Sequence, residues 1–166
     1  MPESARLVIV NATPIISLAL IDQLELLNSL YGQVLTPPVV QTEVLAGGIS
    51  GIGVEQLIKA TWLRTQPLQD PRRAGLLSDL DRGEAEVIAL AQEIKADLVI
   101  IDERLGRMHA KRLGLTVTGT LGVLLKAKES QLISQVAPLI EQLRLGGIRL
   151  SETVIKEALN LAGERQ

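Results

Sequence analysis

The segment at residues 96–122, ADLVIIDERLGRMHAKRLGLTVTGTLG, contains the residues whose types and spacing point most directly to chemistry. A short apolar run, residues 98–101, leads straight into two acids, Asp102 and Glu103. Three cations follow at spacings that place them on one side of a helix. This basic stripe consists of Arg104, Arg107 and Lys111. A carboxylate at the end of a buried strand, beside a basic helix face, suits a site for a metal ion and a phosphate group.

Further polar residues are expected at the same edge of the protein. In an open parallel sheet, sites form where the carboxyl ends of the strands meet helix N-termini. Asn11 ends the first predicted strand, and Thr120 begins a helix after another strand. Glu43 and Glu84 belong to predicted helices that can lean over this edge. Three or four oxygen ligands are therefore expected to come together.

The types of these candidate ligands select the metal. The chain has no cysteine and a single histidine, His109, which is spaced away from the basic stripe and is assigned no role. An all-oxygen set suits a hard ion, Mg²⁺ or Mn²⁺, better than zinc. Such an ion, held by a few carboxylates, is the usual arrangement for phosphoryl transfer, because it lowers the pKa of a bound water and neutralises charge on the phosphate.

Each candidate also has a structural interpretation. Glu84 can be an acid favoured by the dipole at a helix start, and Glu43 can be a solvated surface residue. Glu103 is expected to be exposed or to stand behind the direct ligands. The basic stripe can be an ordinary solvated helix face. Asp102 is the hardest to explain structurally, because four apolar residues precede it.

The composition limits the class of protein. The chain has 166 residues, of which 46% are hydrophobic and 22% charged, as expected for one globular domain over residues 1–166. With one Trp, one Tyr and no Phe, the core must be aliphatic, and aromatic platforms for stacked bases are not available. The lack of cysteine excludes a disulfide scaffold and a cysteine nucleophile and favours an intracellular location.

Charge and hydropathy restrict the partners. The net charge of −2 means that binding to nucleic acid must rest on a local basic patch. No apolar stretch approaches the ~20 residues of a membrane helix, and the N-terminus lacks the pattern of a signal peptide. No membrane association is expected.

Short apolar runs alternate with amphipathic stretches along the chain. The predicted strands cover residues 6–10, 33–36, 62–65, 97–101 and 115–118. The predicted helices cover residues 15–30, 37–44, 55–60, 83–96, 104–113, 121–128, 134–145 and 152–162. This alternation predicts an α/β fold with a parallel sheet covered by helices on both faces.

Local signals place the helix ends and loops. Thr13 and Thr120 are interpreted first as helix caps and second as ligand contacts, and Ser151 is predicted to cap the last helix. Residues 66–73 are predicted to be a loop. The glycine cluster at residues 47–53 is interpreted as a flexible connection and not as a phosphate-binding loop, because no Gly-Lys-Ser/Thr follows it.

Five blocks of this sequence together resemble a known family. They are LVIVNATPIISLALIDQLELL, PPVVQTEV, RGEAEVIALA, LVIIDERLGRMHAKRLGLTVTGTLGVLLKAKE and IRLSETVIKEAL. In this order they resemble PIN-domain proteins, in the prokaryotic branch similar to the toxin ribonucleases of type II toxin–antitoxin systems. The resemblance implies a three-layer α/β/α fold with a short parallel sheet and a metal-dependent endoribonuclease activity on RNA. It also implies a homodimer and a cognate antitoxin protein.

The resemblance assigns roles to particular residues. Glu43 matches the family's acid on the helix after the second strand, and Glu84 matches the acid at the start of the GEAEVIALA helix. Asp102 matches the acid that ends the fourth-strand block, and Thr120 matches the nearby hydroxyl position. Asn11 stands where the family has its first aspartate. An amide offers one carbonyl oxygen to a metal but no negative charge, so metal affinity and catalysis are expected to fall.

The leading hypothesis is a cytoplasmic endoribonuclease that depends on Mg²⁺ or Mn²⁺. Glu43, Glu84 and Asp102 would be its catalytic acids and would hold the metal together with Asn11. The expected contacts to the substrate are Thr13, Arg104, Arg107 and Thr120.

Two other functions remain open. The first is a catalytically inactive PIN-like module that binds RNA or a protein, which the neutral Asn11 favours. The second is a receiver-like phosphoacceptor domain. That reading needs an acid pair at the end of the first strand, where this chain has only Asn11.

Overall fold

A parallel sheet forms the middle of the protein. The structure, a computed structural model, describes residues 6–47 and 51–164. Its strands are β1 (Val8–Val10), β2 (Val34–Thr36), β3 (Leu63–Thr65), β4 (Leu98–Ile100) and β5 (Val117–Thr118). They pair in parallel in the order β3-β2-β1-β4-β5. The predicted parallel sheet is confirmed, and each strand lies within a predicted range.

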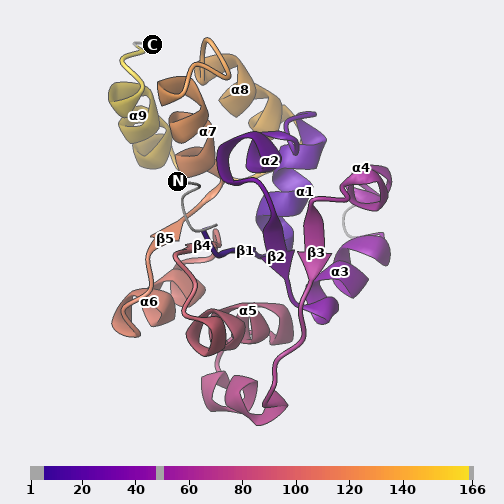
Figure 1. Ribbon diagram of the computed structural model, residues 1–166. Coiled ribbons are helices and arrows are strands. Elements are labelled where there is room, and N and C mark those ends of the chain that lie inside the picture. The colour runs from indigo at the N-terminus through magenta and orange to yellow at the C-terminus, as the bar shows by residue number, and fades with distance from the viewer. Residues whose placement is uncertain (1–5, 48–50, 165–166) are drawn as a thin grey trace, which may run out of the picture.

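Helices cover both faces of this sheet. Along the chain they are α1 (Ala12–Leu20), α2 (Leu26–Tyr31), α3 (Pro38–Leu45), α4 (Val54–Lys59), the 3-10 helix η1 (Pro71–Leu77), α5 (Arg82–Ile94), α6 (Arg104–Arg112), α7 (Thr120–Glu129), α8 (Ala137–Leu145) and α9 (Glu152–Leu161). In Figure 1, α5 and α6 lie below the sheet, whereas α1, α2, α7 and α9 lie above it. This is the three-layer α/β/α arrangement. Because β1 and β4 are covered on both sides, every residue in them is buried and apolar.

The strand order brings the ends of β1 and β4 together. Val10 is in register with Ile100, and the backbone N–H of the next residue, Asn11, donates to the Ile100 carbonyl at 2.9 Å. The residues that follow these two central strands therefore lie side by side at the carboxyl edge of the sheet. This edge is where the sequence predicts a site.

The prediction of one helix over residues 15–30 is wrong. The chain forms α1 and α2, separated by a turn in which Asp22 has a φ of 56°. The N–H groups of Asp22 and Gln23 close the end of α1 on the carbonyls of Ala19 and Leu18. Apolar spacing does not reveal the break, because Ile21 and Leu24 within the turn are also buried. The helix also begins earlier than predicted, at Ala12.

Two loop predictions are modified by the structure. The segment predicted as a loop at residues 66–73 runs into η1, because Asp70 accepts a hydrogen bond from the Arg72 N–H and Pro71 starts the helix. In the glycine cluster at residues 47–53, Gly51 and Gly53 have positive φ and lead into α4. Positions 48–50 of that cluster lie outside the described residues.

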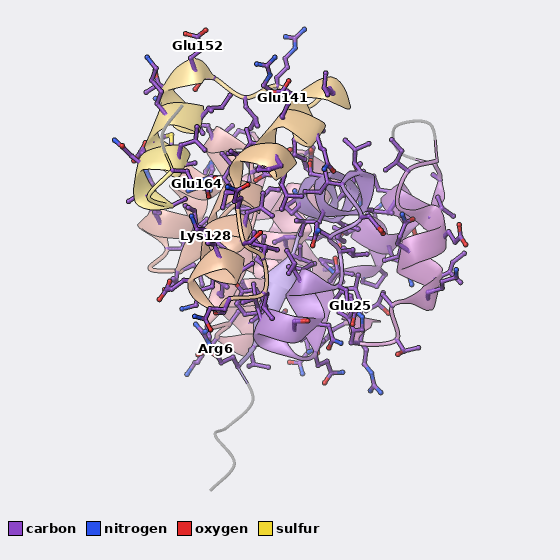
Figure 2. The ribbon with its side chains drawn as sticks, turned by 90° about the horizontal axis from the view of Figure 1, so that it is seen from above. Arg6, Glu25, Lys128, Glu141, Glu152 and Glu164 are labelled. Carbon is purple, nitrogen blue, oxygen red and sulfur yellow. The ribbon has the colours of Figure 1, made fainter. Side chains whose placement is uncertain are left out.

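The C-terminal helices are held together by a partly buried carboxylate. Glu164 accepts hydrogen bonds from the N–H groups of Val136 (2.7 Å) and Ala137 (2.9 Å) and from Lys128 Nζ (2.9 Å). Figure 2 shows Lys128 and Glu164 beside each other in the group of C-terminal helices. Burial alone would raise the pKa of Glu164, but these donors outweigh it and lower the pKa. The predicted cap of α9 is confirmed, since Ser151 Oγ accepts from the Val154 N–H.

The helices can also be compared with the dimensions of a bilayer. Within residues 6–47 and 51–164, no helix combines the length and the apolar character needed to cross a membrane.

Candidate active site

Asn11 is the most informative polar residue at the carboxyl edge of the sheet. It follows β1 directly, is only 4% exposed, and its side chain makes no capping bond to α1. Its amide oxygen Oδ1 is buried and has no hydrogen-bond partner among the described residues. A buried acceptor without a partner costs about 1–3 kcal/mol. Such an atom in a folded protein calls for an explanation, and a bound ion is one.

The Asn11 oxygen faces a space shared with two carboxylates. A methyl group on Gly83 would lie 3.4 Å from Glu43 Oε2, 3.6 Å from Asn11 Oδ1 and 3.6 Å from Asp81 Oδ1. These oxygens come from α3, from the end of β1 and from the residue that caps α5. The absence of a side chain on Gly83 keeps open the space that the three oxygens border.

Glu84 lies in the first turn of α5 and is only 7% exposed. Its backbone N–H donates to Asp81 Oδ1 at 2.8 Å, so Asp81 caps the helix. Burial is the main cause that raises the pKa of Glu84 to about 8, followed by a hydrogen bond with the Asp81 side chain and by neighbouring negative charges. Those charges belong to Asp81, Glu103 and Glu43.

Four carboxylates form an acidic cluster, which consists of Glu43, Asp81, Glu84 and Glu103. Burial raises the pKa of Glu43, and the charges of Asp81 and Glu103 raise it further. The shifts in Glu43 and Glu84 therefore share two causes, desolvation and like charge. A divalent cation would offset both, since it would compensate the lost hydration and the mutual repulsion.

Glu103 is a member of this cluster that the sequence does not identify. Of the two expectations for Glu103, exposure is wrong, because the residue is half-buried. Its Oε1 accepts a hydrogen bond from Thr13 Oγ1 at 2.7 Å, while Oε2 is buried without a partner among the described residues. The prediction that Thr13 caps the helix is wrong, because Thr13 lies inside α1, and its hydroxyl instead orients Glu103. Nothing in the sequence distinguishes Glu103 from a surface acid.

Asp81 was also missed, although the sequence carries a signal for it. Asp81 and Glu84 have the D-x-x-E spacing of a helix-capping pair, and the helix begins at Arg82 as that spacing requires. A capping acid three residues before a buried glutamate must lie close to it. This signal could have located the second carboxylate at the start of α5.

Asp102 has a different environment from that of the acidic cluster. Its Oδ1 accepts from the Thr120 N–H and its Oδ2 accepts from Thr120 Oγ1, both at 2.7 Å. A methyl group on Gly119 would lie 2.6 Å from Asp102 Oδ1 and 2.8 Å from Arg107 Nη1. The carboxylate therefore faces the β5–α7 connection and the guanidinium of Arg107. Thr120, expected to cap α7 with its own side chain, instead donates twice to Asp102.

The basic stripe lies along one wall of a cavity of about 920 Å³. Arg104 and Lys111 are exposed, and Arg107 is half-buried with Nη1 donating to the Ile101 carbonyl at 3.4 Å. None of the three forms an ion pair within the described residues. Helices α7 and α9 provide the other walls, and Thr13, Asp102 and Glu103 are also part of the lining. Unpaired cations beside carboxylates are suited to an anionic substrate.

The donors fit a divalent cation in kind. They are oxygens only, and those of Asn11, Glu43 and Asp81 border the open space at Gly83. Over residues 6–47 and 51–164, however, no three His, Cys, Asp or Glu side chains stand close enough to hold a metal together. His109, which was assigned no role, has its Nε2 2.8 Å from Asp79.

Comparison with known families decides the class of protein. A family model described as a PIN domain matches residues 7–164, which is almost the whole chain. The chain belongs to the PIN-domain family. The comparisons with curated proteins and with solved structures gave no match. Membership in the PIN-domain family indicates a nuclease-like module.

Membership in the PIN-domain family agrees with the fold and indicates that the polar residues at the carboxyl edge of the sheet form its candidate site. The PIN-domain match spans every strand of the sheet and all the residues of the acidic cluster. In this PIN domain, the carboxyl ends of β1 and β4 present Asn11, Asp102 and Glu103, while α3 and α5 contribute Glu43 and Glu84. The site residues expected from the sequence thus approach one edge of the sheet, although Asp102 faces a different neighbour from the others.

Proposed function

We propose that this PIN domain is an endoribonuclease that depends on Mg²⁺ or Mn²⁺. The observation that carries the proposal is the buried, unpartnered oxygen of Asn11, which borders the same space as Glu43 and Asp81. PIN domains in general depend on divalent metal ions and act on RNA, which supports both the cofactor and the substrate.

The proposed roles of the site residues concern the binding of the cation. Asn11, Glu43 and Glu84 would hold the cation, and the resemblance adds Asp102 as a fourth ligand. When bound, Mg²⁺ or Mn²⁺ supplies an activated water and neutralises charge on the phosphate. The burial of Glu84 and Asn11 keeps competing water away from the ligands, which strengthens their electrostatic interactions.

The substrate would approach along the basic stripe. Arg104 and Arg107 form no ion pair among the described residues, so their guanidinium groups are available to phosphate oxygens. Thr13 and Thr120 were also expected to contact the substrate. Their hydroxyls donate to Glu103 and Asp102, so their contribution would be to orient those acids.

Cleavage of a generic single-stranded RNA over a range of Mn²⁺ concentrations tests the proposal. The wild type is expected to cut, Asn11→Asp to cut faster at low Mn²⁺ because it adds a charged ligand, and Glu43→Gln to lose activity. Glu141→Gln, which removes an exposed carboxylate on α8, is the matched control. A wild type that cuts equally well in EDTA would contradict metal dependence.

The second candidate function is a catalytically inactive module that binds RNA or a protein. The neutral Asn11 favours it, because the site then has one negative charge fewer than the family pattern implies. Its signature would be a wild type that binds RNA without cutting it and gains cleavage on Asn11→Asp. Cleavage by the wild type that disappears in Glu43→Gln would exclude it.

We also propose a toxin-like role, with a cognate antitoxin and a homodimer, in the cytoplasm. The resemblance to toxin ribonucleases supports this assignment. Large exposed apolar side chains, among them Leu145 and Leu161 on α8 and α9, supply surface for such contacts. Light scattering coupled to size exclusion measures the mass in solution, and a monomer at all concentrations would remove the dimer from the proposal.

A further inference from the structure

We infer that Glu103, and not Asp102, supplies the carboxylate that the end of β4 contributes to the cation site, while Asp102 holds the N-terminus of α7. This inference rests on the proposed metal dependence of the site. It replaces the assignment that the family resemblance makes for the same stretch of chain.

Asp102 is already occupied by protein donors. Both of its carboxylate oxygens accept a hydrogen bond at 2.7 Å, one from the backbone N–H and one from the hydroxyl of Thr120. These bonds satisfy a backbone donor that the helix cannot satisfy itself, because it lies in the first turn of α7. Turning the carboxylate toward the acidic cluster would break both bonds and leave Thr120, which is 5% exposed, without partners.

Glu103 is held in place but keeps one oxygen free. The Thr13 hydroxyl donates to Oε1, whereas Oε2 is buried and unpartnered among the described residues. Thr13 is two residues from Asn11, whose own Oδ1 is buried and unpartnered in the same part of the structure. One short segment, residues 11–13, therefore presents Asn11 and orients Glu103. Each of these two oxygens is a buried acceptor whose lone pairs a bound cation would take up.

Glu103 lies beside the helix that carries Glu84. Helices α5 and α6 are in contact, with Glu84 in the first turn of α5 and Glu103 directly before the first residue of α6. Gly106, three residues further along the chain, leaves room for Glu84: a methyl group there would lie 3.5 Å from Glu84 Oε2. The start of α6 and the start of α5 thus bring Glu103 and Glu84 toward each other.

Backbone geometry explains why only one of the two consecutive acids can join the cluster. The chain after β4 is extended, with Glu103 at φ −65° and ψ 133°. Successive side chains of an extended segment point to opposite sides. Asp102 therefore bonds to the start of α7, and Glu103 bonds to α1.

Binding of Mn²⁺ alone, measured from the loss of the free-ion signal in electron paramagnetic resonance, tests the inference without using activity. Glu103→Gln is expected to weaken binding about tenfold or more, the scale on which ligand and supporting residues act at metal sites. Asp102→Asn is expected to change Kd less than about threefold and to lower Tm by about 2–4 °C, because it loses one of two bonds to Thr120. Glu86→Gln on α5, whose carboxylate pairs with Arg82 3.0 Å away, is the control.

A second variant protects the test against misfolding. Thr13→Val keeps the shape of the side chain and removes the donor to Glu103, so it is expected to weaken Mn²⁺ binding while the circular dichroism spectrum stays unchanged. Loss of binding in Asp102→Asn, with wild-type binding in Glu103→Gln, would overturn the inference but leave metal dependence intact. A wild type that binds no Mn²⁺ would overturn the inference together with the proposed metal dependence.

Discussion

Replacing Glu84 by glutamine is expected to stabilise the folded protein, and the gain should grow as the pH rises from 5 to 8. Burial, the Asp81 side chain and the nearby charges raise the pKa of Glu84 from 4.5 to about 8. Between these two values the folded protein keeps a proton that the unfolded chain releases. Raising the pH through this window therefore lowers the free energy of unfolding of the wild type.

The magnitude follows from the size of the shift. One group whose pKa moves from 4.5 to about 8 on folding costs up to about 1.4 kcal/mol of stability per pH unit. The slope is smaller near each pKa, so the loss between pH 5 and pH 8 is about 3–4 kcal/mol. Rearrangement within the four coupled carboxylates absorbs part of this cost. Because glutamine resembles the protonated acid, Glu84→Gln is expected to gain about 1–2 kcal/mol at pH 8 and almost nothing at pH 5.

The difference in the free energy of unfolding between wild type and Glu84→Gln can be measured by urea unfolding without divalent metal. The fluorescence of the single tryptophan, Trp62, reports the transition. Glu86→Gln removes a carboxylate from the same helix, but one that pairs with Arg82, and is expected to give no gain at either pH. A gain for Glu84→Gln that is equal at pH 5 and pH 8, or a loss that grows with pH, would refute the reasoning. Either result would mean that Glu84 is ionised in the folded protein without cost.

Three further outcomes are expected. Gly83→Ala should raise Tm, because alanine is favoured over glycine by about 0.5–1 kcal/mol inside a helix. It should also weaken Mn²⁺ binding in the resonance titration, because its methyl group fills the space beside Glu43. Unchanged binding would remove that space from the site. Glu164→Gln should lower the urea midpoint at pH 7 by an amount equivalent to about 1 kcal/mol. Because the pKa of Glu164 is lowered in the folded protein, the difference in stability between wild type and variant should shrink as the pH falls through that pKa. Arg107→Gln should reduce the salt dependence of RNA binding: the slope of log K against log salt concentration, measured by fluorescence anisotropy, should fall by about one. An unaltered slope would show that Arg107 does not contact a phosphate.

Much of the fold could be predicted from apolar periodicity and from proline, glycine and capping residues. The strands were found because fully buried parallel strands require continuous apolar runs, and Ser151 was recognised as a cap from its type and place. The break between α1 and α2 could not be predicted, since the turn at Ile21 and Leu24 is buried and so keeps the apolar pattern of a helix. The spacing of apolar residues indicates which residues are buried. A turn that packs on the same core is buried as well, so this spacing does not distinguish it from a helix.

The candidate site was predictable in its position but not in its details. Asn11 and Asp102 were located because each follows an apolar run, and strand order then places both at one edge of the sheet. Asp102 bonds to Thr120, whereas Glu103 bonds to Thr13. Which of the two acids faces α1 depends on the orientation of the segment after β4, and the order of adjacent acids in a sequence does not reveal it. Asp81 was predictable only in part. Its spacing to Glu84 indicates that it caps α5, but not that the charges of the two carboxylates affect each other.

The sequence alone determined the fold class, the aliphatic core, the all-oxygen character of the candidate site and the presence of asparagine in place of the first aspartate. These are properties of residue types and their spacing, which do not depend on distant contacts. Only the tertiary structure decided which carboxylates share a space, which are occupied by backbone donors, and that the oxygen of Asn11 is buried without a partner. Those properties arise where β1, α3, α5 and the end of β4 meet, and segments that far apart in the chain acquire common neighbours only when the sheet has formed.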